Sequence, residues 1–138
     1  MEIAKERSVA GIKEKDESKT LQGKKLRMET FTYIPEEYYG CGCSLFLTEQ
    51  DEKADIHIYR DAGDIAMIVL NGKIHRMEYK GELNGVTTYS NDSIKVERVH
   101  AKAIESTEME ETVDVEGVLT ITKGKDKLEK KYIGYCGC

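Results

Sequence analysis

The chain of 138 residues contains one proline and no tryptophan, and none of its apolar runs is long enough to cross a membrane as a helix. A spanning helix needs about 20 apolar residues in succession, so we expect no membrane span. The segment Met1–Leu21 is rich in charge and lacks the apolar core of a secretory signal peptide. We therefore expect either a cytosolic protein or the mature form of an exported one.

The motifs of the common enzyme classes are also missing. The sequence contains no Gly-x-Ser-x-Gly elbow, no phosphate loop, no Rossmann glycine pattern and no His-Glu-x-x-His motif. The net charge of −5 disfavours nucleic acid as a partner, because phosphate binding requires a basic surface. We expect a protein that is not an enzyme, that has no catalytic residues and no cofactor, and whose partner is a protein or a small ligand.

Sequence patterns predict an all-β fold. Apolar residues form 39% and charged residues 34% of the chain, as in a soluble globular domain. Short segments rich in β-branched and aromatic residues recur between turn residues, without alternating long helices. We expect a mainly antiparallel barrel or sandwich of about eight short strands. The expected strand segments are Met28–Ile34, Tyr38–Thr48, Asp55–Arg60, Ile65–Leu70, Lys73–Tyr79, Val86–Ser90, Ser93–Val99, Val118–Lys123 and Leu128–Tyr135.

Two parts of the chain are expected to lie outside these strands. Residues 1–27 contain eight basic and five acidic side chains with few apolar ones. This composition predicts a charged, mobile N-terminal arm before a single β domain formed by residues 28–138. Part of Val99–Glu111 is a candidate for a helix.

A hairpin is predicted in the middle of the chain. Ile65–Leu70 is apolar at every position, which indicates an interior strand covered on both faces. Asn71 and Gly72 follow it and suit the two positions of a type I′ turn, both of which need positive φ. This turn places His75 of the returning strand opposite Ile68.

The turn before this strand has two interpretations. A two-residue turn at Ala62 and Gly63 would place His57 opposite Ile68 as well. A loop from Asp61 to Gly63 with a bulge would shift the register by one residue and turn His57 to the other face.

The four cysteines form two copies of a Cys-Gly-Cys tripeptide, one a third of the way along the chain and one at its end. Residues two apart on a strand point to the same face, so each copy presents two sulfurs side by side. Antiparallel pairing joins Cys41 to Cys138 and Cys43 to Cys136, whereas parallel pairing joins Cys41 to Cys136 and Cys43 to Cys138. We predict that the two copies meet on adjacent strands, close the sheet and carry two structural disulfides.

A metal site is the alternative interpretation of these four residues. Thiolates of Cys41, Cys43, Cys136 and Cys138 in one cluster would suit structural zinc, and copper(I) also selects soft thiolates. The spacing disfavours zinc, because zinc sites usually have at least two residues between paired ligands. Redox catalysis is a third interpretation, although the sequence contains no Cys-x-x-Cys motif.

Cysteine usage also bears on the compartment. An even number of cysteines suits an oxidising environment. We therefore expect an extracytoplasmic protein, located in the periplasm or cell envelope or secreted, with a binding or cell-envelope role. The alternative is a cytoplasmic, cysteine-ligated metal-binding protein.

The remaining polar patterns are expected to be structural. The acidic run from Glu105 to Glu116 lacks the Asp-x-Asp-x-Asp-Gly order of a calcium loop, and a charged hairpin with several lysines follows it. The three histidines, His57, His75 and His100, are expected to be ordinary strand residues. The tyrosines before the cysteine tripeptides are expected to pack around the sulfurs; they are Tyr38, Tyr39, Tyr132 and Tyr135.

Overall fold

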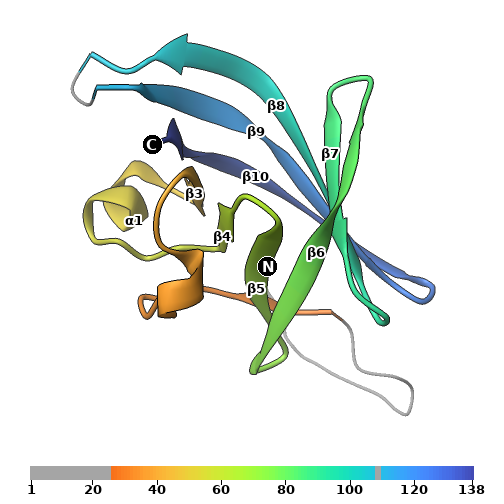
Figure 1. Ribbon diagram of the computed structural model, residues 1–138. Helices are drawn as coiled ribbons and strands as arrows, with labels where there is room; N and C mark the ends of the chain where they lie inside the picture. The colour runs from red at the N-terminus through yellow and green to blue at the C-terminus, as the bar shows by residue number, and fades with distance from the viewer. Residues whose placement is uncertain (1–25, 108–109) are drawn as a thin grey trace.

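A computed structural model describes residues 26–107 and 110–138, and within these residues eight antiparallel strands form a closed barrel with one additional strand (Figure 1). The all-β prediction is confirmed, and the architecture is the barrel. The strands are β2 (Met28–Glu29), β3 (Gly42–Phe46), β4 (Tyr59–Ala62), β5 (Ile65–Leu70), β6 (Lys73–Leu83), β7 (Val86–Ser90), β8 (Lys95–Glu105), β9 (Thr112–Lys123) and β10 (Asp126–Gly137). The short helices are η1, a 3₁₀ turn (Glu36–Tyr38), and α1 (Glu49–Lys53). No helix in the described part of the chain is long and apolar enough to cross a membrane.

The barrel has the simplest possible strand order. From β3 to β10 each strand pairs with the next one in the sequence, and β10 then pairs with β3. This last pairing is antiparallel and places Cys136 opposite Cys43 and Gly137 opposite Gly42. The two Cys-Gly-Cys segments therefore close the barrel, as the sequence predicted.

The central hairpin also agrees with its prediction. Strand β5 has the predicted bounds, and Asn71 and Gly72 have φ values of 50° and 80°. Ile68 pairs with His75 across the hairpin. The alternating residues of β5 face the barrel interior and an outer layer, so both faces of the strand are covered.

The turn before β5 differs from both predicted versions. Ala62 pairs with Ile65, so the turn consists of Gly63 and Asp64, and Gly63 takes the positive φ of 68°. His57 lies before β4 and forms an isolated bridge with Phe31, so it is not placed opposite Ile68.

The helix considered within Val99–Glu111 was wrong. Strand β8 continues to Glu105 and pairs with β9 along this length, with a register shift between His100 and Lys102. Propensity did not decide here, because β9 supplies a pairing partner for this part of β8.

A helix does form elsewhere, in a region predicted as strand and loop. Thr48 caps α1, because its side-chain oxygen accepts a hydrogen bond from the Asp51 amide at 3.0 Å. Tyr38 likewise lies in η1 and not in a strand. Strand β3 is therefore shorter than the predicted segment Tyr38–Thr48.

The predicted N-terminal arm lies outside the described residues, except for its last two positions. Leu26 packs against the barrel core, and the Arg27 amide donates to the Asn71 side chain at 3.1 Å. Leu26 and Arg27 therefore contact the β domain, and the division into an arm and a domain stays a prediction.

Large side chains fill the barrel interior. Each strand contributes alternate residues, and many of these are fully buried. Examples on different strands are Leu45, Tyr59, Ile68, Met77 and Leu119. Such a packed interior stabilises the fold.

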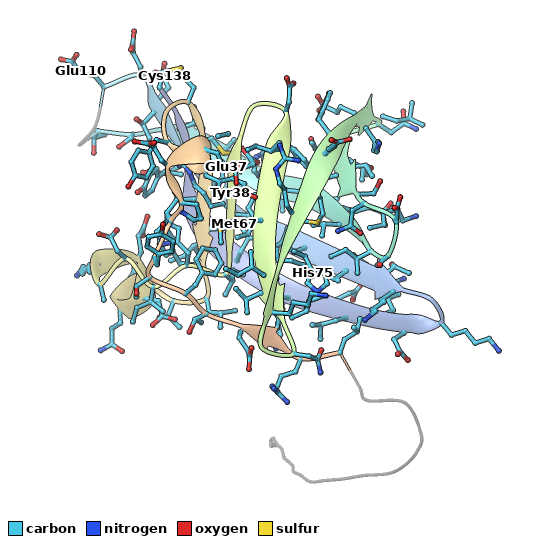
Figure 2. All side chains as sticks on the ribbon, turned by 60° about the horizontal axis from the view of Figure 1, so that its bottom comes forward. Glu37, Tyr38, Met67, His75, Glu110 and Cys138 are labelled. Carbon is cyan, nitrogen blue, oxygen red and sulfur yellow. A yellow bond between two sulfur atoms is a disulfide. The ribbon has the colours of Figure 1, made fainter. Side chains whose placement is uncertain are left out.

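A second buried layer covers β3, β4 and β5 from outside. Met67 points outward from β5 and is nevertheless fully buried, and Tyr38 of η1 is also buried (Figure 2). Arg60 fixes this covering segment by donating to the Tyr38 and Gly40 carbonyls at 2.8 and 2.7 Å and to Ser44 Oγ at 2.9 Å.

Gly117 of β9 leaves space for the Tyr132 side chain of β10 to reach over β9 to the Val99 carbonyl of β8. A Cβ atom at Gly117 would overlap the Val99 carbonyl oxygen and would lie 2.5 Å from the Tyr132 hydroxyl. We expect Gly117→Ala to lower the free energy of unfolding by about 3 kcal/mol, the upper end for overpacking, because backbone atoms must move. Urea denaturation measures this.

Gly124→Ala is the matched control for this variant. Gly124 has φ of 60°, but within the described part of the chain no atom lies within 4 Å of the added Cβ. It should cost only the left-handed backbone penalty of roughly 1–2 kcal/mol. Equal losses for the two variants would show that Gly117 is not sterically required.

Candidate functional site

The structure brings the four cysteines together in two cross-strand disulfides. Cys41 bonds to Cys138 and Cys43 bonds to Cys136, with Cα–Cα separations of 4.1 and 4.0 Å. This is the antiparallel pairing of the two predicted alternatives. In this oxidised state the four sulfurs are bonded in two pairs, and none of them is a free thiolate.

The two bridges have different surroundings. Cys43 is 6% exposed and belongs to the barrel core, whereas Cys41 and Cys138 are exposed at the end of the barrel. The Cys43 amide donates to Asp61 Oδ1 at 2.9 Å, away from β10. Cys43 and Cys136 are therefore a non-hydrogen-bonded pair, in which opposite side chains approach most closely.

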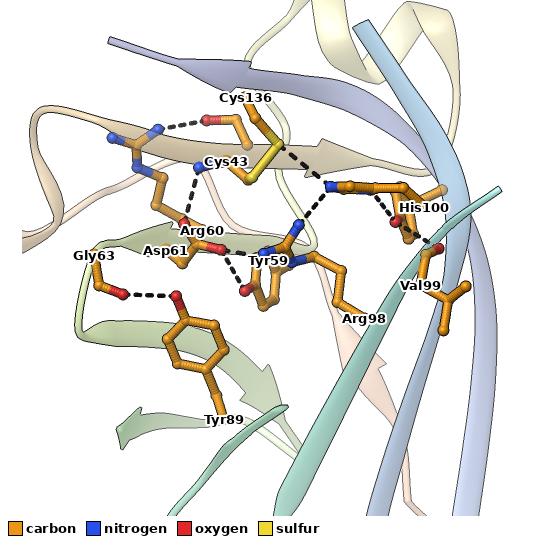
Figure 3. Close-up of a disulfide and its surroundings, with 12 residues drawn as sticks. Cys43, Tyr59, Arg60, Asp61, Gly63, Tyr89, Arg98, Val99, His100 and Cys136 are labelled. Atoms are coloured by element: carbon orange, nitrogen blue, oxygen red, sulfur yellow. Dashed lines mark hydrogen bonds and ion pairs between the residues drawn. A yellow bond between two sulfur atoms is a disulfide. The ribbon is translucent and has the colours of Figure 1, made fainter. Parts of the chain in front are cut away.

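A buried polar cluster adjoins the inner bridge, and Asp61 is its anionic member (Figure 3). Asp61 is 3% exposed and accepts the Tyr59 hydroxyl at 2.5 Å in addition to the Cys43 amide. Arg98 Nε lies 3.7 Å from Asp61 Oδ2, and both side chains are largely buried. The two donated hydrogen bonds and the guanidinium charge offset the desolvation cost of burying this carboxylate.

His100 connects Arg98 to the inner bridge (Figure 3). Arg98 Nη1 lies 2.5 Å from His100 Nε2, and Cys136 Sγ lies 3.7 Å from the same nitrogen. On the other side of the ring, Nδ1 lies 2.7 Å from the Tyr132 hydroxyl, which donates to the Val99 carbonyl at 2.8 Å.

These contacts define the tautomer of His100. A carbonyl can only accept, so the single Tyr132 proton goes to Val99, and His100 Nδ1 must carry the hydrogen donated to Tyr132. Arg98 can only donate, so His100 Nε2 is the nitrogen with the lone pair. Burial, and then the positive charge of Arg98, lower the pKa of His100 to about 4, which keeps the ring neutral at pH 7.

The other two histidines lie away from this cluster. His57 is buried outside the barrel against the rings of Phe31 and Phe46, and burial lowers its pKa. His75 faces the interior opposite Ile68, and burial followed by nearby lysines lowers its pKa. His57 and His75 thus lie apart, one outside the barrel and one facing its interior, and His57 is outside the named strands.

The tyrosines around the sulfurs divide between several environments. Tyr132 is buried and contacts the His100 ring, and Tyr38 is buried in the outer layer. Tyr135 packs on Phe46, whereas Tyr39 is 64% exposed. Tyr39 thus does not contribute to the packing predicted for all four.

A groove of about 490 Å³ runs along the outside of the barrel beside α1. Its floor includes Ile133 and Tyr135 of β10, and its edges carry charged residues from α1, β8 and β9. The charged residues of the lining are Glu49, Glu52, Lys53, Lys102, Asp114 and Glu116. Four carboxylates and two ammonium groups give the groove a negative balance.

Sequence reasoning missed the polar members of the site. Asp61 had been placed only in a turn, and Arg98 and Tyr59 had not been singled out. Alternation within β8 does place Arg98 and His100 on one face, but their contact with β4 and β10 depends on the closed barrel. Asp114 and Glu116 of the acidic run instead line the outer groove.

Comparisons with known protein families, with curated proteins and with solved structures find no match to this chain.

Proposed function

We propose that the protein is a non-enzymatic binding domain of an oxidising, extracytoplasmic compartment. The observation that carries this proposal is the pair of disulfides between the first and last barrel strands. Disulfides of this structural kind persist mainly in secreted proteins and in the cell envelope. Asp61 and His100, which lie near the bridges, have hydrogen-bond partners that account for their positions as structural elements, which supports a role other than catalysis.

The outer groove is the surface proposed for binding. Large side chains occupy the barrel interior, and the groove lies on the outside of the barrel. The groove has a volume in the range of small-ligand sites and combines an apolar floor with carboxylate edges. Its chemistry suits a positively charged ligand with an apolar part, such as a lysine-containing peptide segment.

Trapping of thiols in the native cell tests the proposed compartment. Cells are quenched in acid and treated with a bulky maleimide before and after reduction. We expect no labelling of the protein before reduction and labelling of four thiols after it, whereas labelling of all four thiols before reduction contradicts export. A chain with all four cysteines replaced by serine should show no shift in either sample.

A peptide titration followed by NMR tests the groove. We expect a short peptide of alternating lysine and leucine to perturb amides of α1 and β8–β10, and a glutamate–leucine peptide to leave them unchanged. Removing two carboxylates with D114N/E116Q should weaken binding about fivefold, since each exposed ion pair contributes roughly 0.2–1 kcal/mol.

The matched control for this titration is E82Q/E129Q, which removes two exposed carboxylates that do not line the groove. It should leave the affinity unchanged. Equal weakening by both double variants would indicate general charge attraction and would refute a specific groove site.

A further inference from the structure

We infer that reduction of the Cys43–Cys136 bridge creates a zinc site whose ligands are Cys43 Sγ, Cys136 Sγ and His100 Nε2. These three atoms already lie within 4.8 Å of one another. The site differs from the four-thiolate cluster that was the alternative interpretation of the sequence, because a histidine takes part and the exposed outer bridge is not required. It is also independent of the proposed binding groove.

The separation of the ligand atoms suits tetrahedral zinc. Zn–S and Zn–N bonds of about 2.3 and 2.0–2.1 Å at a tetrahedral angle place sulfur and nitrogen about 3.5 Å apart. Cys136 Sγ and His100 Nε2 are 3.7 Å apart. Two zinc-bound sulfurs lie roughly 3.8 Å apart on the same geometry. The Cα atoms of Cys43 and Cys136 are 4.0 Å apart, so rotation of the freed side chains supplies this separation.

The imidazole is already oriented for metal ligation. The hydrogen bond from Nδ1 to Tyr132, which is held in turn by the Val99 carbonyl, leaves the Nε2 lone pair beside Cys136. Metal-bound histidines usually donate their other ring hydrogen to a fixed acceptor, which sets the tautomer and the ring orientation. Tyr132 occupies that position here.

Arg98 is the group that must change its partner. In the oxidised protein Arg98 Nη1 donates to His100 Nε2 at 2.5 Å. Zinc binding to the reduced pair provides two thiolate acceptors around His100 Nε2, the atom that Arg98 already contacts, and Asp61 holds Arg98 from the other side at 3.7 Å. Arg98 can therefore release Nε2 and donate to a zinc-bound sulfur, which satisfies a buried donor and leaves the nitrogen to the metal.

The chemistry balances with a dithiol as reductant. The dithiol transfers two electrons and two protons to the bridge, the S–S bond breaks, two thiols form and the dithiol becomes a cyclic disulfide. Binding of Zn²⁺ then displaces both thiol protons into solvent. Because disulfide sulfurs are not thiolates, oxidation of the same pair expels the ion.

The test uses cobalt(II) as a spectroscopic probe and zinc(II) as competitor, under anaerobic conditions after reduction with dithiol and its removal. The C41S/C138S variant keeps only the inner pair. We expect it to bind one cobalt ion, with thiolate charge-transfer absorption and the visible bands of tetrahedral cobalt, and to lose both on addition of zinc. The oxidised form of the same variant should show neither.

Two further variants identify the ligands. C43S/C136S should abolish the charge-transfer absorption. His100→Gln should weaken zinc binding at least about tenfold, because loss of even an outer-shell partner costs roughly 10–100-fold. His75→Gln, which removes a histidine elsewhere in the barrel, should bind as the parent does.

Three results would overturn the inference. One is unchanged zinc affinity in His100→Gln, and another is loss of the cobalt spectrum in C41S/C138S, which would indicate a four-thiolate cluster. The third is loss of the near-ultraviolet circular dichroism signal in the reduced, zinc-bound chain, which would show that its tertiary structure is lost. A metal-bound but unfolded chain would show that the barrel does not build this site.

Discussion

Replacing Asp61 with alanine is expected to destabilise the barrel by about 3–5 kcal/mol, because this change leaves a buried guanidinium without its counter-charge. Asp61 also accepts from the Cys43 amide and the Tyr59 hydroxyl, so both donors lose their partner. Among residues 26–107 and 110–138, Arg98 Nε finds no hydrogen-bond partner apart from this ion pair, whose side chains are 11% and 5% exposed.

Urea denaturation of four chains isolates this effect. Asp61→Ala is compared with Arg98→Leu, with the double variant and with Asp114→Ala, which removes an exposed carboxylate from β9. The double variant should be more stable than Asp61→Ala, because no unpaired buried charge remains. A loss for Asp61→Ala as small as that for Asp114→Ala would contradict the assigned role of the cluster.

Replacing all four cysteines with serine is expected to cost about 6–7 kcal/mol of unfolding free energy. The bridges join residues 97 and 93 positions apart, and in the chain-entropy model the first bridge across such a loop contributes roughly 4–5 kcal/mol and the second, which closes only a small ring, adds about 2 kcal/mol. The two bridges close nearly the same loop. Removing either pair alone should therefore cost only about 2 kcal/mol, the value for the small ring between them.

Denaturation of C41S/C138S, C43S/C136S and the four-serine chain tests this non-additivity. C43S/C136S should be the less stable of the two single-pair variants, because Cys43 is buried and a serine hydroxyl there needs a partner. Addition of reductant to the four-serine chain is the control and should change nothing. A four-serine chain as stable as the parent would contradict a structural role for the bridges.

The parts of the fold that were predictable from sequence depend on residues that are contiguous in the chain or on the repeated tripeptide. The β5–β6 hairpin follows from an apolar run and the positive φ of Asn71 and Gly72, which are contiguous in the chain. The meeting of the two Cys-Gly-Cys tripeptides follows from their identity, whereas the choice of the antiparallel over the parallel pairing comes from the structure. Neither inference needs knowledge of the intervening strands.

The polar cluster was not predictable for a physical reason. Asp61, Arg98 and Tyr132 belong to three strands far apart in the sequence, and their contact depends on the register of every strand between them. The turn at Gly63 and Asp64 sets the register of β4 against β5 and thus which residues of β4 face inward. The register shift between His100 and Lys102 changes which residues at the end of β8 face inward. Helix α1 was missed because five residues are too few to show a helical period.

The central claim is that β3 and β10 pair antiparallel and are joined by Cys41–Cys138 and Cys43–Cys136. The most direct measurement is alkylation of free thiols, read by intact mass, in three double variants purified without reductant. C41S/C138S and C43S/C136S each keep one native pair and should show no alkylation. C41S/C136S leaves Cys43 and Cys138 at diagonal positions roughly 7–8 Å apart, too far to bridge without backbone movement, and both should be alkylated. Complete protection of C41S/C136S, with free thiols in the other two variants, would contradict the antiparallel closure.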